Sequence, residues 1–119
     1  MDNNISWILD LSVKEGKLDD LKTLTEEMVN ATKTNEPDAI DYSWNISEDK
    51  KKVQIYEKYK DSDVTLLHLK NFMENFAERF MSTLDINSLV VYGNPGDELK
   101  NTLSGLGAVF MSHFGGFSR

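Results

Sequence analysis

The sequence predicts an α+β domain in which an antiparallel sheet carries its two main helices on one face. Two observations predict this class. Four segments alternate apolar and polar side chains with the two-residue period of a strand, and two longer segments have the apolar spacing of amphipathic helices. The elements follow one another in the order β-α-β-β-α-β, which is the split βαβ arrangement of ferredoxin-like domains. With 119 residues, the chain has the length of one domain.

The strands are predicted from their alternation and from the turns between them. In the first strand, Ile5, Trp7 and Leu9 alternate with mostly polar neighbours, which predicts one buried face. The second strand has an aromatic face with Tyr42 and Trp44, and a hairpin turn joins it to the third strand. The predicted strands cover residues 5–13, 40–46, 53–59 and 85–92.

The two main helices have recognisable start and stop signals. The first helix begins near Leu18 and ends before Pro37, because the residue that precedes a proline disfavours a helix. The second helix begins after Asp61, whose side chain can cap the first backbone N–H groups, and it is expected to run as one helix to about Met81.

Residues 1–95 form the predicted domain, and residues 96–119 form a C-terminal extension with a short helix over 97–106. The extension is too apolar for a disordered segment, so we expect it to pack on the same domain or on a dimer partner. Its apolar side chains are Leu99, Leu103, Leu106, Val109, Phe110, Phe114 and Phe117.

The composition excludes several classes of function. The chain has 20 acidic and 13 basic side chains, and this acidic balance without a basic patch does not suit nucleic acid, where phosphate neutralisation supplies most of the affinity. With no cysteine, it has no disulfide and no cysteine-based metal site. Neither a signal peptide nor an apolar run near the ~20 residues of a membrane span is evident, which predicts a cytoplasmic protein without membrane contact.

Large apolar side chains are expected on both faces of the sheet, as Trp7 beside Ile8 and Val90 beside Val91 indicate. Helices cover only one face in this arrangement, so the other face needs a partner. The simplest partner is a second copy of the chain. The sequence therefore predicts a homodimer whose two sheets pack face to face.

The strongest candidate for chemistry is His68. Val64, His68, Phe72 and Phe76 are spaced by four and form one ridge of the second helix, which turns His68 inward near the start of that helix. Two interpretations stay open. His68 is either a core histidine hydrogen-bonded to a strand, or a catalytic group at the mouth of an apolar pocket, where an imidazole can accept a proton.

The other candidates are aromatic or acidic. Glu57 and Tyr59 share one face of the third strand, and the sequence does not decide whether that face lies under the helices or against a dimer partner. The aromatic side chains either fill the core or line a site for a flat ring. The candidate ligand-binding residues are Tyr42, Trp44, Glu57, Tyr59, Phe72 and Phe76.

The sequence lacks the motifs of common cofactors. It has neither a Gly-x-Gly-x-x-Gly turn nor a P-loop, so the usual cradles for dinucleotides and nucleoside triphosphates are missing. Its two histidines are far apart in the chain and do not suggest a metal triad. We therefore expect no cofactor and no metal.

Taken together, these features resemble the antibiotic biosynthesis monooxygenase family, a group of small dimeric α/β barrels that includes quinol monooxygenases. The resemblance covers about residues 5–95. It is carried by the order of elements and by Glu36-Pro37, Tyr42, Trp44, the stretch YEKYKDS at 56–62, His68-Leu69 and Val91-Tyr92-Gly93-Asn94-Pro95.

The resemblance implies a cofactor-independent monooxygenase that oxidises a quinol or another phenolic aromatic with O2. A phenol deprotonated in an apolar pocket can reduce O2 itself, so the protein has only to hold the ring, exclude water and manage one proton. Some members of the family degrade haem and many have no known activity. Two alternatives therefore stay open: a dimer that binds a small molecule without turnover, and a haem-degrading enzyme with His68 as the axial ligand.

Overall fold

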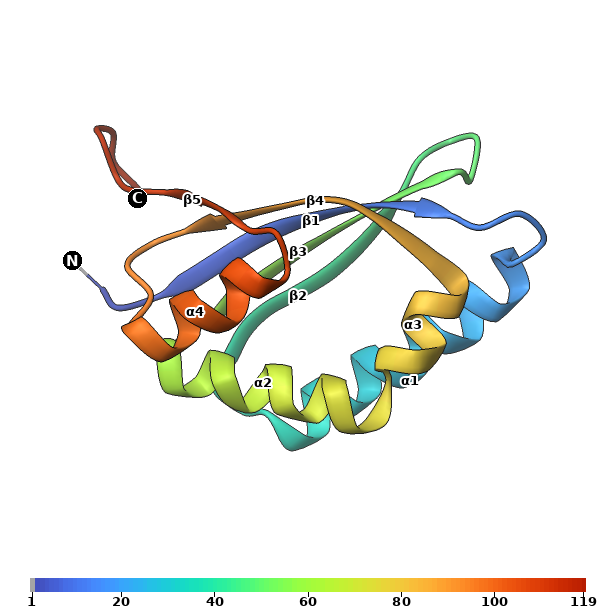
Figure 1. The fold of residues 1–119 in the computed structure, drawn as a ribbon, viewed down its shortest axis with the longest axis horizontal. Coiled ribbons are helices and arrows are strands. Elements are labelled where there is room, and N and C mark those ends of the chain that lie inside the picture. Colours follow the sequence, from blue (N-terminus) through green and yellow to red (C-terminus); the bar gives the residue numbers. More distant parts are fainter. Residues whose placement is uncertain (1) are drawn as a thin grey trace.

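The computed structural model describes residues 2–119 and shows a five-stranded sheet with every helix on one side (Figure 1). The strands are β1 (Ile5–Val13), β2 (Ala39–Ile46), β3 (Lys52–Tyr59), β4 (Leu84–Tyr92) and β5 (Val109–Met111), and the helices are α1 (Leu18–Asn35), α2 (Ser62–Asn75), α3 (Ala77–Thr83) and α4 (Asp97–Gly105). The strand order is β2-β3-β1-β4-β5. This confirms the predicted ferredoxin-like α+β class, including the short C-terminal helix.

The edge strand β5 is an addition that the sequence pattern does not predict. After α4 the chain turns at Gly107, whose φ of +80° favours glycine, and the next residues pair with β4 in parallel register. Three residues are too few for an alternation to be recognised. The sheet is therefore mixed at this edge, whereas the other neighbouring strands are antiparallel as predicted.

The predicted second helix is divided into α2 and α3 at Phe76. This residue has φ −132° and ψ −16°, outside the helical range. It is the C-cap of α2 and the N-cap of α3. The break leaves Phe80 edge to face with Phe72, with ring centroids 5.2 Å apart. A spacing of four along the ridge does not reveal one non-helical residue, which is why the sequence predicts a single helix.

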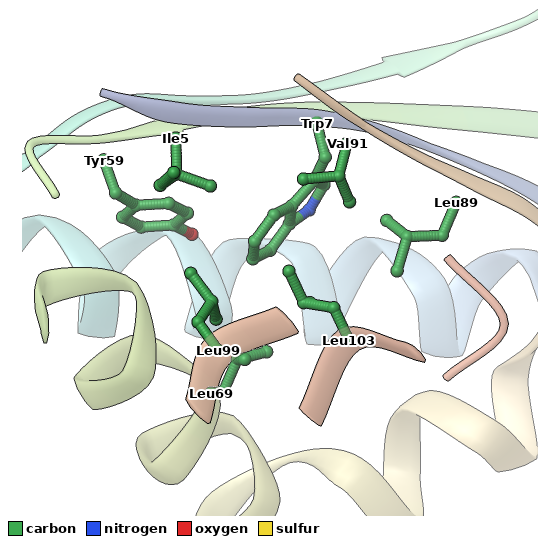
Figure 2. Close-up of a cluster of buried hydrophobic side chains, with 8 residues drawn as sticks. All are labelled: Ile5, Trp7, Tyr59, Leu69, Leu89, Val91, Leu99 and Leu103. Atoms are coloured by element: carbon green, nitrogen blue, oxygen red, sulfur yellow. The ribbon is translucent and has the colours of Figure 1, made fainter. Parts of the chain in front are cut away.

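Two apolar clusters fill the space between the sheet and the helices, and Leu9 packs against both. The first cluster joins β1, β3 and β4 to α2 and α4 (Figure 2), and it consists of Ile5, Trp7, Tyr59, Leu69, Leu89, Val91, Leu99 and Leu103. The second lies toward α1 and α3 and consists of Leu11, Leu21, Leu24, Met28, Val53, Ile55, Phe80 and Leu84. Because α4 contributes two fully buried leucines, it is part of the core of the domain.

The chain beyond β5 differs from α4. Phe114 and Phe117 are 105% and 80% exposed in the single chain, whereas Phe110 of β5 packs against the first cluster. The packing of these two phenylalanines on a dimer partner stays a prediction.

The face of the sheet that carries no helix is mixed in character. Ile8 lies opposite Tyr56 of β3 and Val90 of β4, and these three half-buried side chains form an apolar strip. Next to it, Gln54 donates a hydrogen bond to Asp10 at 3.2 Å. The homodimer expected from this face stays a prediction. No helix within residues 2–119 is long and apolar enough to cross a membrane.

Candidate functional site

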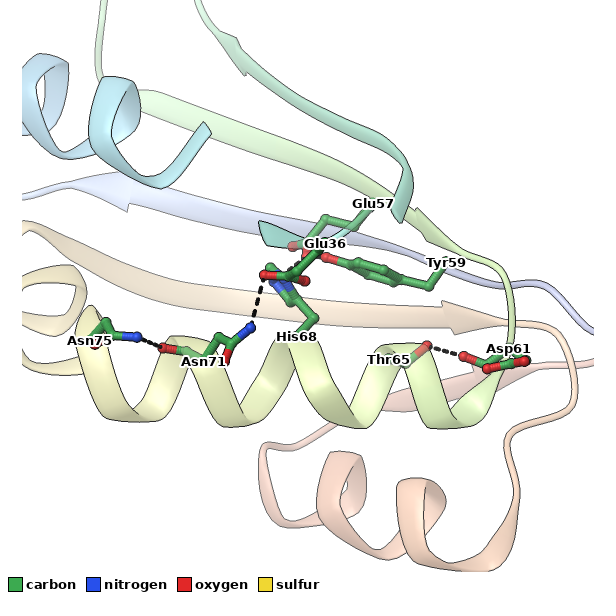
Figure 3. A network of polar contacts seen from close by, with 8 residues as sticks. All are labelled: Glu36, Glu57, Tyr59, Asp61, Thr65, His68, Asn71 and Asn75. Carbon is green, nitrogen blue, oxygen red and sulfur yellow. Dashed lines mark hydrogen bonds and ion pairs between the residues drawn. The ribbon is translucent and has the colours of Figure 1, made fainter. Parts of the chain in front are cut away.

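A buried polar network lies between the sheet and α2, and His68 is at its centre (Figure 3). The Nδ1 atom of His68 is 2.8 Å from Oε1 of Glu36, and its Nε2 atom is 3.2 Å from Oε1 of Glu57. The hydroxyl of Tyr59 donates to the same Glu57 oxygen at 2.5 Å. All three partners and His68 itself are at most 5% exposed, so the network is buried.

Three elements position the members of the network: α2 carries His68, β3 carries Glu57 and Tyr59, and Glu36 caps α1. Asp61 caps α2 by accepting a hydrogen bond from the backbone N–H of Val64 at 3.0 Å, and this fixes the start of the helix that carries His68. Glu57 and Tyr59 are two residues apart on β3 and therefore point to the same side of the sheet, which is the helix side. This settles the face that the sequence leaves open.

Glu36 is the member that sequence reasoning does not identify as a site residue. It is the C-cap of α1, immediately before the proline that ends the helix. A negative charge is unfavourable at a helix C-terminus, because the helix dipole is negative there. An acidic C-cap therefore suggests that a cation compensates it, and here that cation is the ring of His68.

The electrostatics of the network keep His68 charged. Burial alone would lower the pKa of His68, but its hydrogen bonds to Glu36 and Glu57 and the attraction of both carboxylates outweigh burial and raise this pKa to about 9. Burial, and next the nearby charge of Glu57, raise the pKa values of Tyr42 and Tyr59 well above the ordinary range. At neutral pH the site therefore contains an imidazolium between two carboxyl groups, with two phenols that keep their protons.

The network forms part of the wall of an apolar cavity with a volume of about 220 Å³. Four of the residues predicted for the site line it: Tyr42, Glu57, His68 and Phe72. The remaining wall is almost entirely apolar. It is built by Trp7, Leu9, Met28, Ile55, Leu69, Met73, Ala77, Phe80, Met81, Ile86, Leu89, Leu103 and Leu106.

The other predicted site residues lie outside this cavity. Tyr59 supports Glu57 and stacks at 4.8 Å on the ring of His68. Trp44 lines a separate groove between α1 and β2, although it also touches Phe80. Phe76 lines a small polar cleft between α1 and α2.

His68 lines this polar cleft as well as the apolar cavity. The volume of the cleft is about 140 Å³. Its polar residues are Thr32, Asn35, Glu36, Asn71 and Asn75. The imidazolium therefore separates an apolar cavity on one side from a polar cleft on the other, which is a suitable place for a group that exchanges protons.

The ring nitrogens of His68 are both occupied by carboxyl oxygens, which leaves neither free to bind a metal. Within residues 2–119, no group of three or more His, Cys, Asp or Glu side chains is arranged to hold a metal ion. The donor set fits acid–base chemistry on a ligand in the cavity.

The fold is shared with several solved proteins. MupZ from Pseudomonas fluorescens matches with a TM-score of 0.87 and 22% identity over 100% of this chain and 91% of that chain. A protein from Nitrosomonas europaea named "putative antibiotic biosynthesis monooxygenase" matches with a TM-score of 0.67 and 20% identity over 81% of this chain and 97% of that chain. SnoaB, named as a cofactor-independent oxygenase from Streptomyces nogalater, matches with a TM-score of 0.64 and 11% identity over 81% and 96%.

These similarities confirm the resemblance in fold to the antibiotic biosynthesis monooxygenases. No model of a known protein family matches the sequence, and no curated protein matches it. At such low sequence identities the similarities concern the fold alone, so the chemistry has to be argued from the site.

Proposed function

We propose that the chain is a monooxygenase-like enzyme that oxidises a small quinol or phenol with O2 and needs no bound cofactor. The observation that carries this proposal is the carboxyl–imidazolium–carboxyl cluster on the wall of an otherwise apolar cavity. The fold of SnoaB, named as a cofactor-independent oxygenase, supports it. Drug-sized ligands occupy pockets of roughly 300–1,000 Å³, so the smaller cavity here suits one or two rings.

In this proposal, Glu57 is the general base. It lines the cavity, and both of its contacts within the network use Oε1, so Oε2 is the oxygen that can face a ligand. The O–H bond of the phenol breaks, its proton goes to Glu57, and the electron pair stays on the phenolate. The nearby imidazolium of His68 stabilises the negative charge that moves from the carboxylate to the ring in the buried site.

The phenolate then supplies the electrons for O2. One oxygen atom enters a ring carbon and the other leaves as water, so a phenol becomes a quinone and the ring provides all four electrons. Cleavage of the O–O bond requires a proton for the departing oxygen. His68 supplies this proton through Glu57, which lies 3.2 Å from its Nε2 and lines the cavity, and its contact with Glu36 at the polar cleft gives it a route to recover the proton.

The haem-degrading alternative is less favoured. An axial ligand needs a free imidazole nitrogen, and both nitrogens of His68 face carboxyl oxygens. Titration with haemin tests this point, because a Soret shift at micromolar haemin would restore the alternative.

Oxygen uptake separates an enzyme from a protein that only binds its ligand. We expect uptake with some members of a panel of quinols and naphthols, and a loss of at least ~100-fold in Glu57→Gln, which is the usual contribution of a general base. Glu26→Gln, on the exposed surface of α1, is the matched control. Binding of a quinol without uptake by the wild-type protein would favour the non-catalytic alternative.

We also propose that the chain forms a homodimer through the helix-free face of the sheet. The apolar strip of Ile8, Tyr56 and Val90 supports this. Light scattering after size exclusion should give twice the chain mass of 13.6 kDa, and Tyr56→Lys should shift the population toward the monomer. A wild-type monomer at micromolar concentration would contradict the dimer.

A further inference from the structure

Trp7 carries a buried polar atom, its indole Nε1, for which residues 2–119 supply no partner. Its side chain is 3% exposed, and its indole Nε1 makes no hydrogen bond within residues 2–119. Trp7 packs against the ring of Tyr59 at 5.4 Å and lines the apolar cavity. Figure 2 shows the indole nitrogen on the edge of the ring that is turned toward Leu89, away from Tyr59.

The strand register places this indole directly beside the proposed base. Trp7 of β1 lies opposite Glu57 of β3, and Tyr42 of β2 lies opposite Glu57 on its other side. Residues paired in this way have Cβ atoms roughly 4.5–5.5 Å apart and point to the same face. A phenol, a carboxyl group and an indole N–H therefore follow one another across three adjacent strands, and all three residues line the cavity.

The nitrogen edge of the Trp7 indole is turned toward Leu89, an apolar side chain of the cavity wall that cannot accept a hydrogen bond (Figure 2). Glu57, which lies opposite Trp7 in the strand register, does not accept a hydrogen bond from this nitrogen. A buried N–H without an acceptor is unfavourable, and buried donors in native proteins nearly always have a partner. A ligand oxygen in the cavity that Trp7 lines can supply this acceptor.

We propose that Trp7 determines specificity by donating its indole N–H to a second oxygen of the ligand, while the first oxygen faces Glu57. This inference rests on the proposed function and narrows its substrate class. The ligand is a small phenol or quinol that carries a further acceptor oxygen, such as a carbonyl, on the ring or on a short substituent. A phenol without that oxygen leaves the indole unpartnered.

The other unpartnered indole serves as a reference. Trp44 Nε1 is also buried without a hydrogen bond to any of the described residues 2–119, but Trp44 lines the groove between α1 and β2 and is not part of the cavity wall. The two tryptophans are the only ones in the chain, so their side-chain N–H signals can be assigned with one variant.

The test uses two phenols of similar size, 4-hydroxyacetophenone and 4-ethylphenol, added without oxygen to ¹⁵N-labelled wild-type protein. We expect the Trp7 N–H proton signal to move downfield with 4-hydroxyacetophenone but not with 4-ethylphenol, while the Trp44 signal is the reference. Failure of both ligands to move the Trp7 signal would overturn the inference. Because no turnover is needed, this result is independent of whether the protein consumes O2.

A binding comparison provides the second readout. Trp7→Phe keeps an aromatic ring and removes the donor. Its affinity for 4-hydroxyacetophenone should therefore be about fivefold weaker than that of the wild-type protein, which is the value of one neutral hydrogen bond. Its affinity for 4-ethylphenol should stay within about twofold of the wild-type value. An equal loss of affinity for both phenols would show that Trp7 acts through packing alone and would overturn the inference. Comparing two ligands in one variant cancels any general loosening of the cavity.

Discussion

Replacing Glu36 by glutamine tests whether the two carboxyl groups hold the charge of His68. The amide oxygen can still accept a hydrogen bond from Nδ1, now 2.8 Å from Glu36 Oε1, but one negative charge is lost. An opposite charge at this distance contributes about 1–3 pKa units. We therefore expect the pKa of His68, about 9 in the wild-type protein, to fall by at least ~1 unit in Glu36→Gln.

The same shift predicts how stability depends on pH. The pKa of His68 is about 9 in the folded chain and ~6.5 in the unfolded chain. The stabilisation of the folded chain by charged His68 is therefore fully present below pH ~6.5 and is lost as the pH rises through about 9. The difference between the two pKa values corresponds to about 3 kcal/mol in the free energy of unfolding. The variant should lose part of this dependence on pH.

The assay is a proton NMR titration of the imidazole together with urea unfolding between pH 6 and pH 10. His113→Asn in both backgrounds leaves one histidine to observe, and His113 is exposed. Lysine and surface tyrosine titrations occur in both proteins, so the difference between them isolates the network. A wild-type His68 pKa below 6.5, or one that Glu36→Gln leaves unchanged, would refute the reasoning.

Two further changes test the site and the C-terminal helix by urea unfolding at pH 7. Tyr59→Phe removes the hydrogen bond to the buried Glu57 and should cost about 1–3 kcal/mol; Tyr56→Phe, on the helix-free face, is the control, and equal losses would count against the network. Leu103→Ala in α4 should cost about 2–5 kcal/mol because Leu103 is fully buried. Leu106→Ala, at a site that is 47% exposed, should cost much less, and a stable Leu103→Ala protein would show that α4 is dispensable.

The sequence predicts the fold because its local signals agree with one another. Ile5 and Trp7 occupy alternate positions of β1 and both prove to be buried, and Asp61 caps α2 as expected. The parts that escape prediction are those that long-range contacts decide. β5 exists only because its three residues reach the edge of β4, and no local pattern marks such a pairing.

The site is only half predictable for a similar reason. The inward position of His68 follows from helical spacing, but the partners of its ring come from α1 and β3, which are distant in sequence. Glu36 looks like a helix stop, and the one local sign of its role is its unfavourable place at a helix C-terminus. Trp7 looks like a core residue in the sequence, and only the three-dimensional arrangement shows that its N–H lacks an acceptor in the part of the chain that the structure describes.

The most direct test of the proposed chemistry is oxygen labelling with ¹⁸O2 and a phenol that supports uptake, without added metal or cofactor. The wild-type protein should place one labelled atom in the quinone product and the other in water, and Glu57→Gln should form at least ~100-fold less labelled product. Unlabelled product, or equal labelling by the wild-type protein and Glu57→Gln, would contradict the account of Glu57 as the base that starts the reaction with O2.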